Sequence, residues 1–317
     1  MPFSNAFPHY KPNNSENLLE DGSPWLSVLI PAYEYATGVD RILQVIASQK
    51  PSDVECIVRD DSHSDDVLNV VEGRIRRQEV AHLTYIRSPD RKGAVDNWNS
   101  LVTIARGEYI VLMHHDEVPL GPDFFAALRS ELSADGGTDV LVLGCLIGQE
   151  SGTHLHRHMP VVLQSFLLRV IGSAYLLRHN FIGPPSVFVI RRSICPSFDV
   201  RLKWLVDVDW MNRGMQPDSL RWKVSRYLRI ASLQRTGASI TASLKDKLRD
   251  IERMELAQIC KEQNVGLWAA LLQPHNGRSR CLAALDTSLW LTIKVAVRLL
   301  ALVARTHNPF RLSRPSS

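Results

Sequence analysis

The stretch EYIVLMHHDEVP, residues 108 to 119, begins with apolar residues and ends on two imidazoles and two carboxylates. Its apolar half predicts a buried β-strand. Its polar half follows without a break and contains His114, His115, Asp116 and Glu117. Such groups lose hydration when they are packed at the lip of a sheet, so we expect them to bind a ligand there.

Expected strands and helices alternate along the chain on both sides of this stretch. Short apolar runs alternate with segments in which apolar residues recur at helical spacing, as Val39, Ile42, Leu43 and Ile46 do. The expected strands are residues 25–33, 54–61, 82–88, 108–115 and 139–147, with helices between them. Strands joined by helices pair in parallel and carry helices on both faces of the sheet, so the sequence predicts an α/β protein.

The second half of the chain is less regular. It offers one further strand at 185–193, a loop entering a helix at 204–215, and a long helix from Leu244 to Ile259. We expect a flexible leader at 1–24, an α/β domain at 25–241 and a C-terminal helical region at 242–317. The α/β domain divides into a regular part, 25–147, and an irregular part, 148–241.

Composition narrows the class of protein. A chain of 317 residues with 45% hydrophobic residues can bury a full core. The net charge of +4 gives no concentrated basic face for nucleic acid. Five scattered cysteines without a C-x-x-C pair indicate reduced thiols, and the polar leader shows no secretory signal. These features favour a cytoplasmic protein.

The candidate binding residues follow the expected strands. Ligands of such sheets bind beyond the carboxyl ends of the strands. Acidic residues are frequent there, and carboxylates repel phosphates unless a divalent cation takes oxygen ligands from both. Asp116, helped by Glu117 and His114, would hold Mn²⁺ or Mg²⁺, and a mixed imidazole and carboxylate set suits Mn²⁺ somewhat better.

Several common enzyme motifs are absent from the sequence. No G-x-G-x-x-G follows the first strand, and there is no Walker loop, G-x-S-x-G or H-E-x-x-H. Their absence argues against the usual dehydrogenases, P-loop enzymes, hydrolases and zinc proteases.

Five motifs in order resemble one known family. They are SVLIPAYE (27–34), IVRDDSHSD (57–65), KGAVDNWNSLVTIARGEYIVLMHHDE (92–117), IGPPSVFVIRRS (182–193) and FDVRLKWLVDVDW (198–210). The chain is similar over residues 25–241 to glycosyltransferase family 2, the inverting transferases of GT-A fold. It looks closest to bacterial members that build O-antigen, capsule and exopolysaccharide chains, in which a segment like Gly93, Asn97 and Trp98 precedes the acidic strand.

This resemblance implies a fold and an activity. The fold would be a Rossmann-like, mostly parallel sheet with flanking helices and a C-terminal helical extension. Residues 25–147 would bind a nucleotide diphosphate sugar, and residues 148–241 would bind a glycan or lipid-linked acceptor. A divalent cation would assist transfer of the sugar.

The resemblance also assigns residues. It implies nucleotide-sugar contacts for Pro31, Tyr33, Glu34, Asp60, Asp61, Lys92, Gly93, Asn97, His115, Asp116 and Arg235. His114-His115-Asp116 stands where the family has Asp-x-Asp, so that Asp116 is the expected metal ligand and His114 its partner. A metal-contacting histidine of many relatives is replaced by Thr236.

Asp207 in WLVDVDW matches the catalytic acid of the family, although Val206 replaces the glutamate that precedes it there. The resemblance implies that Asp207 is the general base, which removes the proton from the acceptor hydroxyl. Asp209, in the same segment, is the alternative base.

Other interpretations stay open at this point. Asp60 and Asp61 can instead cap the following helix, and His114 can be a structural histidine. His114 and Thr236 stand where the family has metal-contacting residues of other types. The chain can therefore be a non-catalytic homologue that binds sugar nucleotides. A nucleotidyltransferase of similar sheet topology is the other alternative.

The C-terminal run SLWLTIKVAVRLLALVART, residues 288–306, is apolar except for Lys294, Arg298 and Arg305 at helical spacing. This pattern is typical of a helix lying in a membrane surface, and it also suits a helix packed on the domain. Residues 165–180 offer a second membrane contact or an acceptor-binding helix. Neither stretch is a clean transmembrane helix.

Overall fold

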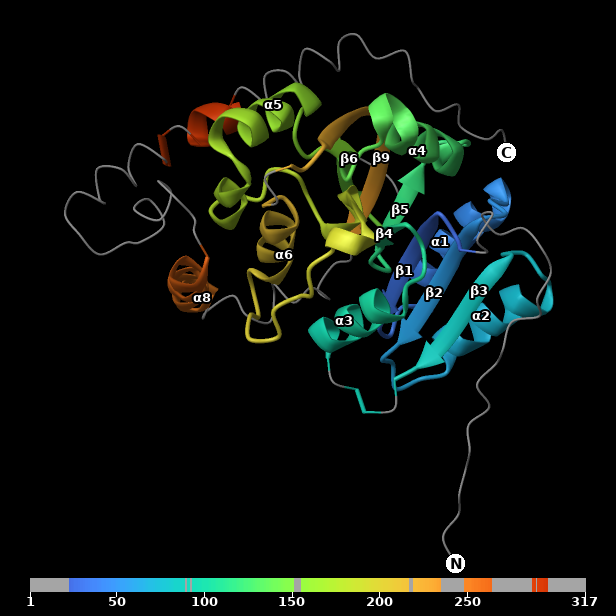
Figure 1. The fold of residues 1–317 in the computed structure, drawn as a ribbon. Helices are drawn as coiled ribbons and strands as arrows, with labels where there is room; N and C mark the ends of the chain where they lie inside the picture. The colour runs from blue at the N-terminus through green and yellow to red at the C-terminus, as the bar shows by residue number, and fades with distance from the viewer. Residues whose placement is uncertain are drawn as a thin grey trace, which may run out of the picture.

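The computed structural model describes residues 23–88, 90–91, 93–150, 155–216, 219–234, 248–263, 287–288 and 290–295. Within these ranges, nine strands form one sheet in the order β3-β2-β1-β4-β8-β6-β9-β5, and β7 pairs with β6 beside this path. Figure 1 shows helices on both faces of the sheet. This arrangement confirms the predicted α/β class.

The elements of the first half follow the predicted alternation. They are β1 (Leu26–Ala32), α1 (Ala36–Gln49), β2 (Val54–Asp60), α2 (Asp66–Arg76), β3 (His82–Arg87), α3 (Ala94–Ile104) and β4 (Tyr109–Leu112). The remaining elements are β5 (Glu117–Leu120), α4 (Phe124–Ser133), β6 (Val140–Gln149), β7 (His156–Arg157), α5 (Val161–Phe166), β8 (Phe188–Arg191), α6 (Val206–Gly214), β9 (Trp222–Gln234) and α8 (Leu248–Glu262). Short 3₁₀ and π-helical turns connect α5 to β8.

The order of the strands reverses between β1 and β4, and we call the region beyond the carboxyl ends of these two strands the β1–β4 crevice. β1 pairs in parallel with β2 on one side and with β4 on the other. The chain leaves β1 toward β2 and β3 and then returns to β4, so the strand order reverses at this point. Ligands of α/β sheets bind at such a reversal, beyond the carboxyl ends of the strands. The loops after Ala32 and Leu112 therefore frame the expected site.

The second half introduces antiparallel pairing. β8 lies antiparallel between β4 and β6, and β5 pairs antiparallel with β9. The long β6–β9 ladder is parallel, so parallel ladders contain most of the residue pairs, as predicted. The expected strand 108–115 is shorter than predicted, because the chain turns at His114–Asp116 and starts the additional strand β5.

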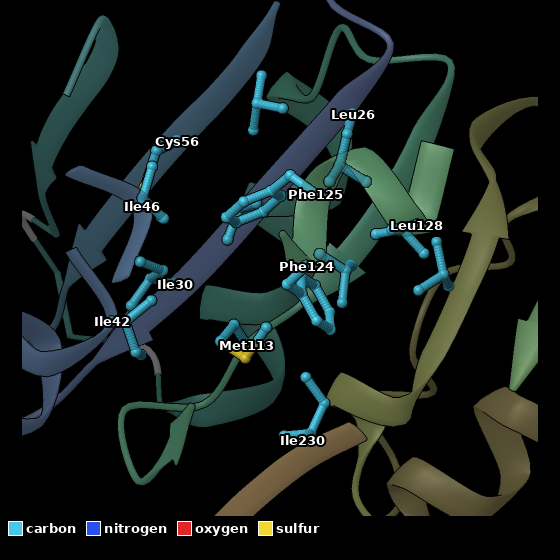
Figure 2. Close-up of a cluster of buried hydrophobic side chains, with 14 of the residues drawn as sticks. Leu26, Ile30, Ile42, Ile46, Cys56, Met113, Phe124, Phe125, Leu128 and Ile230 are labelled. Carbon is cyan, nitrogen blue, oxygen red and sulfur yellow. The ribbon is translucent and has the colours of Figure 1, made fainter. Parts of the chain in front are cut away.

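Two hydrophobic clusters cover the two faces of the sheet. The first contains side chains from α1, α2 and α4, with Ile42, Phe125 and Leu128 among them. Figure 2 shows the phenylalanines of α4 directed at the sheet beside Ile30 of β1. The second cluster contains side chains from α3, α6 and α8. Burial from both faces explains why β1 is apolar almost throughout.

Helix α8 belongs to the second cluster. Its Leu256 and Ile259 are buried together with Trp210 and Met211 of α6. The predicted domain boundary after residue 241 therefore separates residues that share one core. Residues 1–22 of the predicted leader and residues 244–247 of the predicted helix lie outside the described residues.

The short helical segment 290–295 packs on the protein through Trp290, whose ring stacks on His179 at 4.2 Å between centroids. Leu291, Lys294 and Val295 are exposed on its other side. Among the described residues, no helix has the length and apolar character that crossing a bilayer requires. Arg298 and Arg305 of the predicted basic stripe lie outside the described residues.

Candidate active site at the β1–β4 crevice

The turn between β4 and β5 gathers three metal-ligating side chains. His114, Asp116 and Glu117 each offer one ligand atom, and these atoms all lie within 4.8 Å of one another. We call these three residues the acidic cluster. The turn is closed twice, because the His114 amide donates to Glu117 Oε2 at 3.0 Å and the Glu117 amide donates to the His114 carbonyl at 3.0 Å. Glu117 thus holds the turn that also carries His114 and Asp116.

The turn is pressed against the start of α1. A Cβ on Gly38 would lie 1.9 Å from the carbonyl oxygen of His115 and 2.5 Å from the Tyr35 ring. Only glycine fits at this distance. The His115 ring packs edge-on against Tyr35, and its Nδ1 lies 3.4 Å from the Tyr33 amide. His115 therefore joins the loop after β1 to the loop after β4.

Burial sets the charge state of the acidic cluster. It lowers the pKa of His114, although the Asp116 and Asp207 carboxylates act against this shift. It raises the pKa of Glu117 well above its ordinary value, and the Asp116 charge adds to the effect. The imidazole is therefore neutral and able to accept a cation, while the Glu117 negative charge is costly without one.

These residues fit a divalent cation. The Nε2 atom of His114 is buried and makes no hydrogen bond within the described part of the chain, which leaves a ligand atom in need of a partner. Ligands on opposite sides of a small divalent ion lie about 4.2 Å apart, so that small side-chain rotations suffice to bring the three groups onto one ion. Mixed nitrogen and oxygen donors suit Mn²⁺.

Asp207 comes to the acidic cluster from α6. It lies in the first turn of this helix and accepts a hydrogen bond from the Val208 amide at 2.8 Å. Burial raises its pKa, and the His114 imidazole, when charged, acts in the opposite direction. Asp207 is thus near enough to His114 for the two groups to interact electrostatically, although they are far apart in the chain.

Asp209 is placed differently. Its carboxylate is fully buried, and the Arg213 guanidinium and the Gln263 amide both donate to it, at 2.8 and 2.5 Å. Both oxygens of Asp209 are thus engaged by neighbours on α6 and just beyond α8.

The two aspartates after β2 are also distinct. Asp60 is fully buried and accepts hydrogen bonds from the Ser62 amide at 2.9 Å and the Tyr85 hydroxyl at 2.8 Å. Asp61 is 7% exposed, and its Oδ1 makes no hydrogen bond to any described residue. The Asp60 carboxylate therefore stabilises the turn after β2, whereas the Oδ1 atom of Asp61 can still accept a hydrogen bond. Helix α2 begins at Asp66, and no side chain caps its start.

The loop after β1 is tied to the loop after β2. Glu34, with φ of 48°, accepts hydrogen bonds from the His63 amide at 2.5 Å and the Ser64 hydroxyl at 3.1 Å. The His63 amide is the main cause of the lowered pKa of Glu34. Tyr33 is 52% exposed, whereas Pro31 is buried two residues beyond the last β1–β4 pair. Tyr33 and Glu34 are thus exposed, and Tyr33 is the aromatic one of the two.

The start of α3 depends on two residues of the predicted set. Gly93 precedes the helix with φ of 95°, a conformation that favours glycine. Asn97 is buried and joins α3 to β2, donating to the Arg59 carbonyl at 3.1 Å and accepting from the Arg59 side chain at 3.2 Å. Asn97 thus orients Arg59. Lys92 and Arg235 of the predicted set, like Thr236, lie outside the described residues.

The sequence did not assign a role to the aromatic residues behind the acidic cluster. The Trp98 ring lies 5.0 Å from the His114 ring and 5.1 Å from the Phe198 ring, between centroids. Phe198 in turn stacks on Trp210 of α6 at 4.6 Å. This row of rings connects the acidic cluster to the helix that carries Asp207. Its sequence signal was the aromatic position of the Gly-x-x-x-Asn-aromatic segment.

A strand-order reversal with His114, Asp116, Glu117 and a buried acid beyond the strand ends fits the glycosyltransferases of GT-A fold. The family model described as glycosyl transferase family 2 matches residues 27–197, and the chain belongs to this family.

Two curated relatives are similar in sequence. An uncharacterized protein of Mycobacterium tuberculosis, MT1568, is 26% identical over 299 residues, which cover 90% of this chain and 88% of that protein. The GalNAc(5)-diNAcBac-PP-undecaprenol beta-1,3-glucosyltransferase of Campylobacter jejuni is 24% identical over 152 residues, 46% of this chain and 48% of that enzyme. The match therefore spans about half of the glucosyltransferase.

Solved structures share the fold. S. aureus TarS 1–349 in complex with UDP-GlcNAc has a TM-score of 0.57 at 17% identity, covering 78% of this chain and 69% of that one. The match covers 41% of the longer TarS chain. The mannosyltransferase PcManGT from Pyrobaculum calidifontis, in complex with GDP-Man and Mn²⁺, has a TM-score of 0.54 at 14% identity, covering 92% and 88% of the two chains. At these identities, the likeness concerns the fold.

Proposed function

We propose that the protein transfers a sugar from a nucleotide diphosphate sugar to a glycan or lipid-linked acceptor, with inversion at the anomeric carbon. The observation that carries this proposal is the position of Asp207, a buried acid of raised pKa, beside the acidic cluster. One group suited to accept a proton and one set suited to hold a divalent cation thus line the same crevice. Transfer in cell-surface polysaccharide synthesis is the role we infer.

The donor would lie across the β1–β4 crevice. Asp61, with its unused buried oxygen, would accept a hydrogen bond from the base or the ribose, and the exposed Tyr33 ring would flank the nucleotide. His114, Asp116 and Glu117 would hold Mn²⁺ or Mg²⁺. When bound, the cation supplies charge neutralisation for the diphosphate leaving group.

Asp207 would act as general base. A raised pKa makes its carboxylate a better proton acceptor, provided that the working pH keeps it ionised. It would take the proton of the acceptor hydroxyl while this oxygen attacks the anomeric carbon opposite the leaving group, and such an in-line attack inverts the configuration. Asp209 is less suited, because Arg213 and Gln263 already occupy its oxygens.

A thermal-shift panel of UDP, GDP, dTDP and their sugars, with and without Mn²⁺, tests donor binding. We expect cation-dependent stabilisation for one base, and Asp116→Ala should abolish the cation dependence. Asp207→Asn should keep the donor-induced shift but lower transfer or donor hydrolysis by about 100-fold or more. Asp209→Asn should instead lower the melting temperature, because it weakens the Arg213 ion pair. Normal transfer by Asp207→Asn would refute the base assignment.

The replacement of the family's first metal aspartate by His114 favours one alternative, a homologue that binds the donor without catalysis. In that case the native protein with Mn²⁺ would bind the donor and release no nucleoside diphosphate, while His114→Asp would restore hydrolysis. Hydrolysis by the native protein would reject this alternative.

The acceptor side carries an exposed apolar row. Val162, Phe166 and Val170, spaced four residues apart, are 82%, 53% and 66% exposed. Beside them, a hollow of about 480 Å³ is lined by basic residues, Arg169, Lys223 and Arg226, together with the exposed Tyr227 and the acid Glu131. Apolar side chains next to basic ones suit an anionic lipid surface, so we infer peripheral contact with the cytoplasmic face of a membrane.

Vesicle flotation tests this contact. The protein should float with vesicles containing phosphatidylglycerol and much less with pure phosphatidylcholine. Phe166→Asp should reduce the floated fraction, whereas Val200→Asp, a matched change at an exposed valine of another loop, should not. Equal flotation of the Phe166→Asp variant and the native protein would place the membrane contact elsewhere or exclude it.

A further inference from the structure

One buried carboxylate outside the crevice holds the segment that leads to Asp207. Glu255 of α8 is 6% exposed and accepts hydrogen bonds from three successive backbone amides. The Lys203 amide donates to its Oε1 at 2.6 Å, the Leu205 amide donates to its Oε2 at 2.8 Å, and the Trp204 amide lies between them at 3.1 and 3.3 Å.

These three amides stand directly before helix α6. Leu205 is the N-cap residue of α6, and no side chain from the preceding loop caps this helix. A negative charge at a helix start is favourable, because the unsatisfied amides carry partial positive charge. Glu255 therefore anchors from another helix the backbone that enters α6, and Asp207 follows only two residues after the last amide that it holds.

The end of α8 also contacts α6. Gln263, just beyond α8, donates to Asp209 at 2.5 Å and accepts from Asn212 at 3.1 Å. Contacts at the start and in the body of α6 fix its rotation as well as its position. The side that carries Asp207 is thereby turned toward the acidic cluster.

A purely structural contact would not need a charge at residue 255. Burying a carboxylate costs free energy, and an apolar side chain packs between helices without that cost. What the carboxylate adds is direction, since three charged hydrogen bonds define where the backbone at 203–205 lies. We propose that Glu255 is a positioning residue, which places the Asp207 carboxylate for proton transfer. This proposal rests on the proposed role of Asp207 as base.

The test compares two glutamines on the same helix in the full-length protein. Glu255→Gln loses the charge and offers only one acceptor oxygen to the three amides. Glu262→Gln breaks an exposed ion pair between α8 and Arg201 of the same loop, and serves as the control. The assay is Mn²⁺-dependent hydrolysis of UDP-GlcNAc and of GDP-mannose, and the thermal shift by each donor measures binding.

Glu255→Gln should lower kcat by roughly tenfold to 100-fold while KM and the donor-induced thermal shift stay within about twofold of the native values, the range expected for misplacement of a catalytic group. Glu255→Asp, which keeps the charge on a shorter side chain, should recover part of the loss. Glu262→Gln should behave like the native protein. If Glu255→Gln melts at a lower temperature but keeps its kcat, the residue is only structural and the proposal is wrong.

A double variant separates this proposal from the role of Asp207. If both hold, Glu255→Gln should add little to the loss already caused by Asp207→Asn, because both changes remove the same proton transfer. If the double variant instead loses activity by the product of the two single-variant factors, the positioning role is wrong and the base role stands. Activity retained in Asp207→Asn alone would overturn the base role, and the positioning role would fall with it.

Discussion

Glu117 combines two tasks that conflict in the absence of a cation. Its side chain closes the turn between β4 and β5, and it also offers a ligand atom to the metal position. Burial and the nearby Asp116 raise its pKa well above the ordinary value of 4.5. A group whose pKa is raised by folding stabilises the protein below the unfolded pKa, and this contribution is lost as the pH rises through the folded pKa. Without a cation, ionisation of Glu117 therefore lowers the stability of the folded protein, and this cost grows as the pH rises.

Replacement of Glu117 should expose this cost. The carbonyl of Glu117→Gln can still accept the hydrogen bond from the His114 amide, but the side chain cannot ionise. We expect the cation-free variant to melt a few degrees higher than the native protein at pH 8, at about 2–4 °C per kcal/mol. The difference should narrow toward pH 5, where the native carboxyl binds its proton. Differential scanning calorimetry at several pH values measures it, and a lower melting temperature at pH 8 would contradict the expectation.

Protons should also compete with the cation at this residue. The increase in melting temperature caused by Mn²⁺ should be larger at pH 8 than at pH 6, because Glu117 must lose its proton to bind. Burial lowers the pKa of His114, so this residue should add less pH dependence than an ordinary histidine. In Glu117→Gln, the increase should be smaller and nearly independent of pH. A titration with Mn²⁺ at the two pH values tests this. If the increase in melting temperature depends on pH equally in the native protein and in Glu117→Gln, another group competes with the cation.

At the scale of elements, the acidic cluster depends on how closely α1 approaches the turn after β4. Gly38 makes this approach possible, since any Cβ there would overlap the His115 carbonyl. Sequence patterns could not reveal this constraint, because the glycine lies in a helix and the segment that it contacts is far along the chain.

Gly38→Ala should therefore disturb the metal position although the residue contacts no ligand. Overpacking of this kind costs about 1–3 kcal/mol, and we expect a lower melting temperature together with a weakened response to Mn²⁺. Gly73→Ala in α2 is the matched control. There the nearest atoms belong to the flexible end of Arg77, at 3.3 Å, and alanine favours the helix by up to about 1 kcal/mol. Native stability of Gly38→Ala would show that α1 can retreat from the turn.

The sequence predicted the local elements better than their pairing. Apolar periodicity located α1, α2, α3 and the strands between them, because burial of one face is a local pattern. It missed β5, which is four residues long and contains Pro119, and it could not foresee that β8 would enter antiparallel between β4 and β6. The direction of a neighbouring strand is decided by the path of the connecting chain.

The site shows the same difference between features that are local in sequence and features that depend on the fold. The ordered motifs predicted Asp116 and Asp207 as residues of one site, and in the structure both interact electrostatically with His114. The sequence analysis kept Asp209 as the alternative base, and the structure shows its carboxylate paired with Arg213, four residues later on α6. Glu255 could not be found in this way, because nothing near it in sequence points to the amides that it holds.

At the scale of the whole molecule, α8 shares one hydrophobic core with α6, although the family match ends at residue 197. It buries Leu256 and Ile259 in the core of the second half and holds α6 through Glu255. Each of the two apolar side chains contributes about 1.5–3 kcal/mol when fully buried. Their sum is a large part of the 5–15 kcal/mol that is usual for the stability of a domain.

Removal of α8 should therefore unfold the protein or leave it prone to aggregation. A chain ending after residue 247 should lose cooperative melting, whereas a control chain ending after Gln263 should retain it. Circular dichroism during heating distinguishes the two. Cooperative melting of the shorter chain near the native temperature would show that α8 is dispensable for folding.

The ladder between β4 and β8 has consequences for recombining such proteins. It contains only two residue pairs, Tyr109↔Arg191 and Ile110↔Ile190, and it is the one ladder that joins the β1–β4 block to the remaining strands of the described sheet. A chimaera that takes its donor half from another relative would have few backbone bonds to match along this seam. The harder requirement would be the fit of Trp98 against Phe198, where the two parental halves meet through side chains.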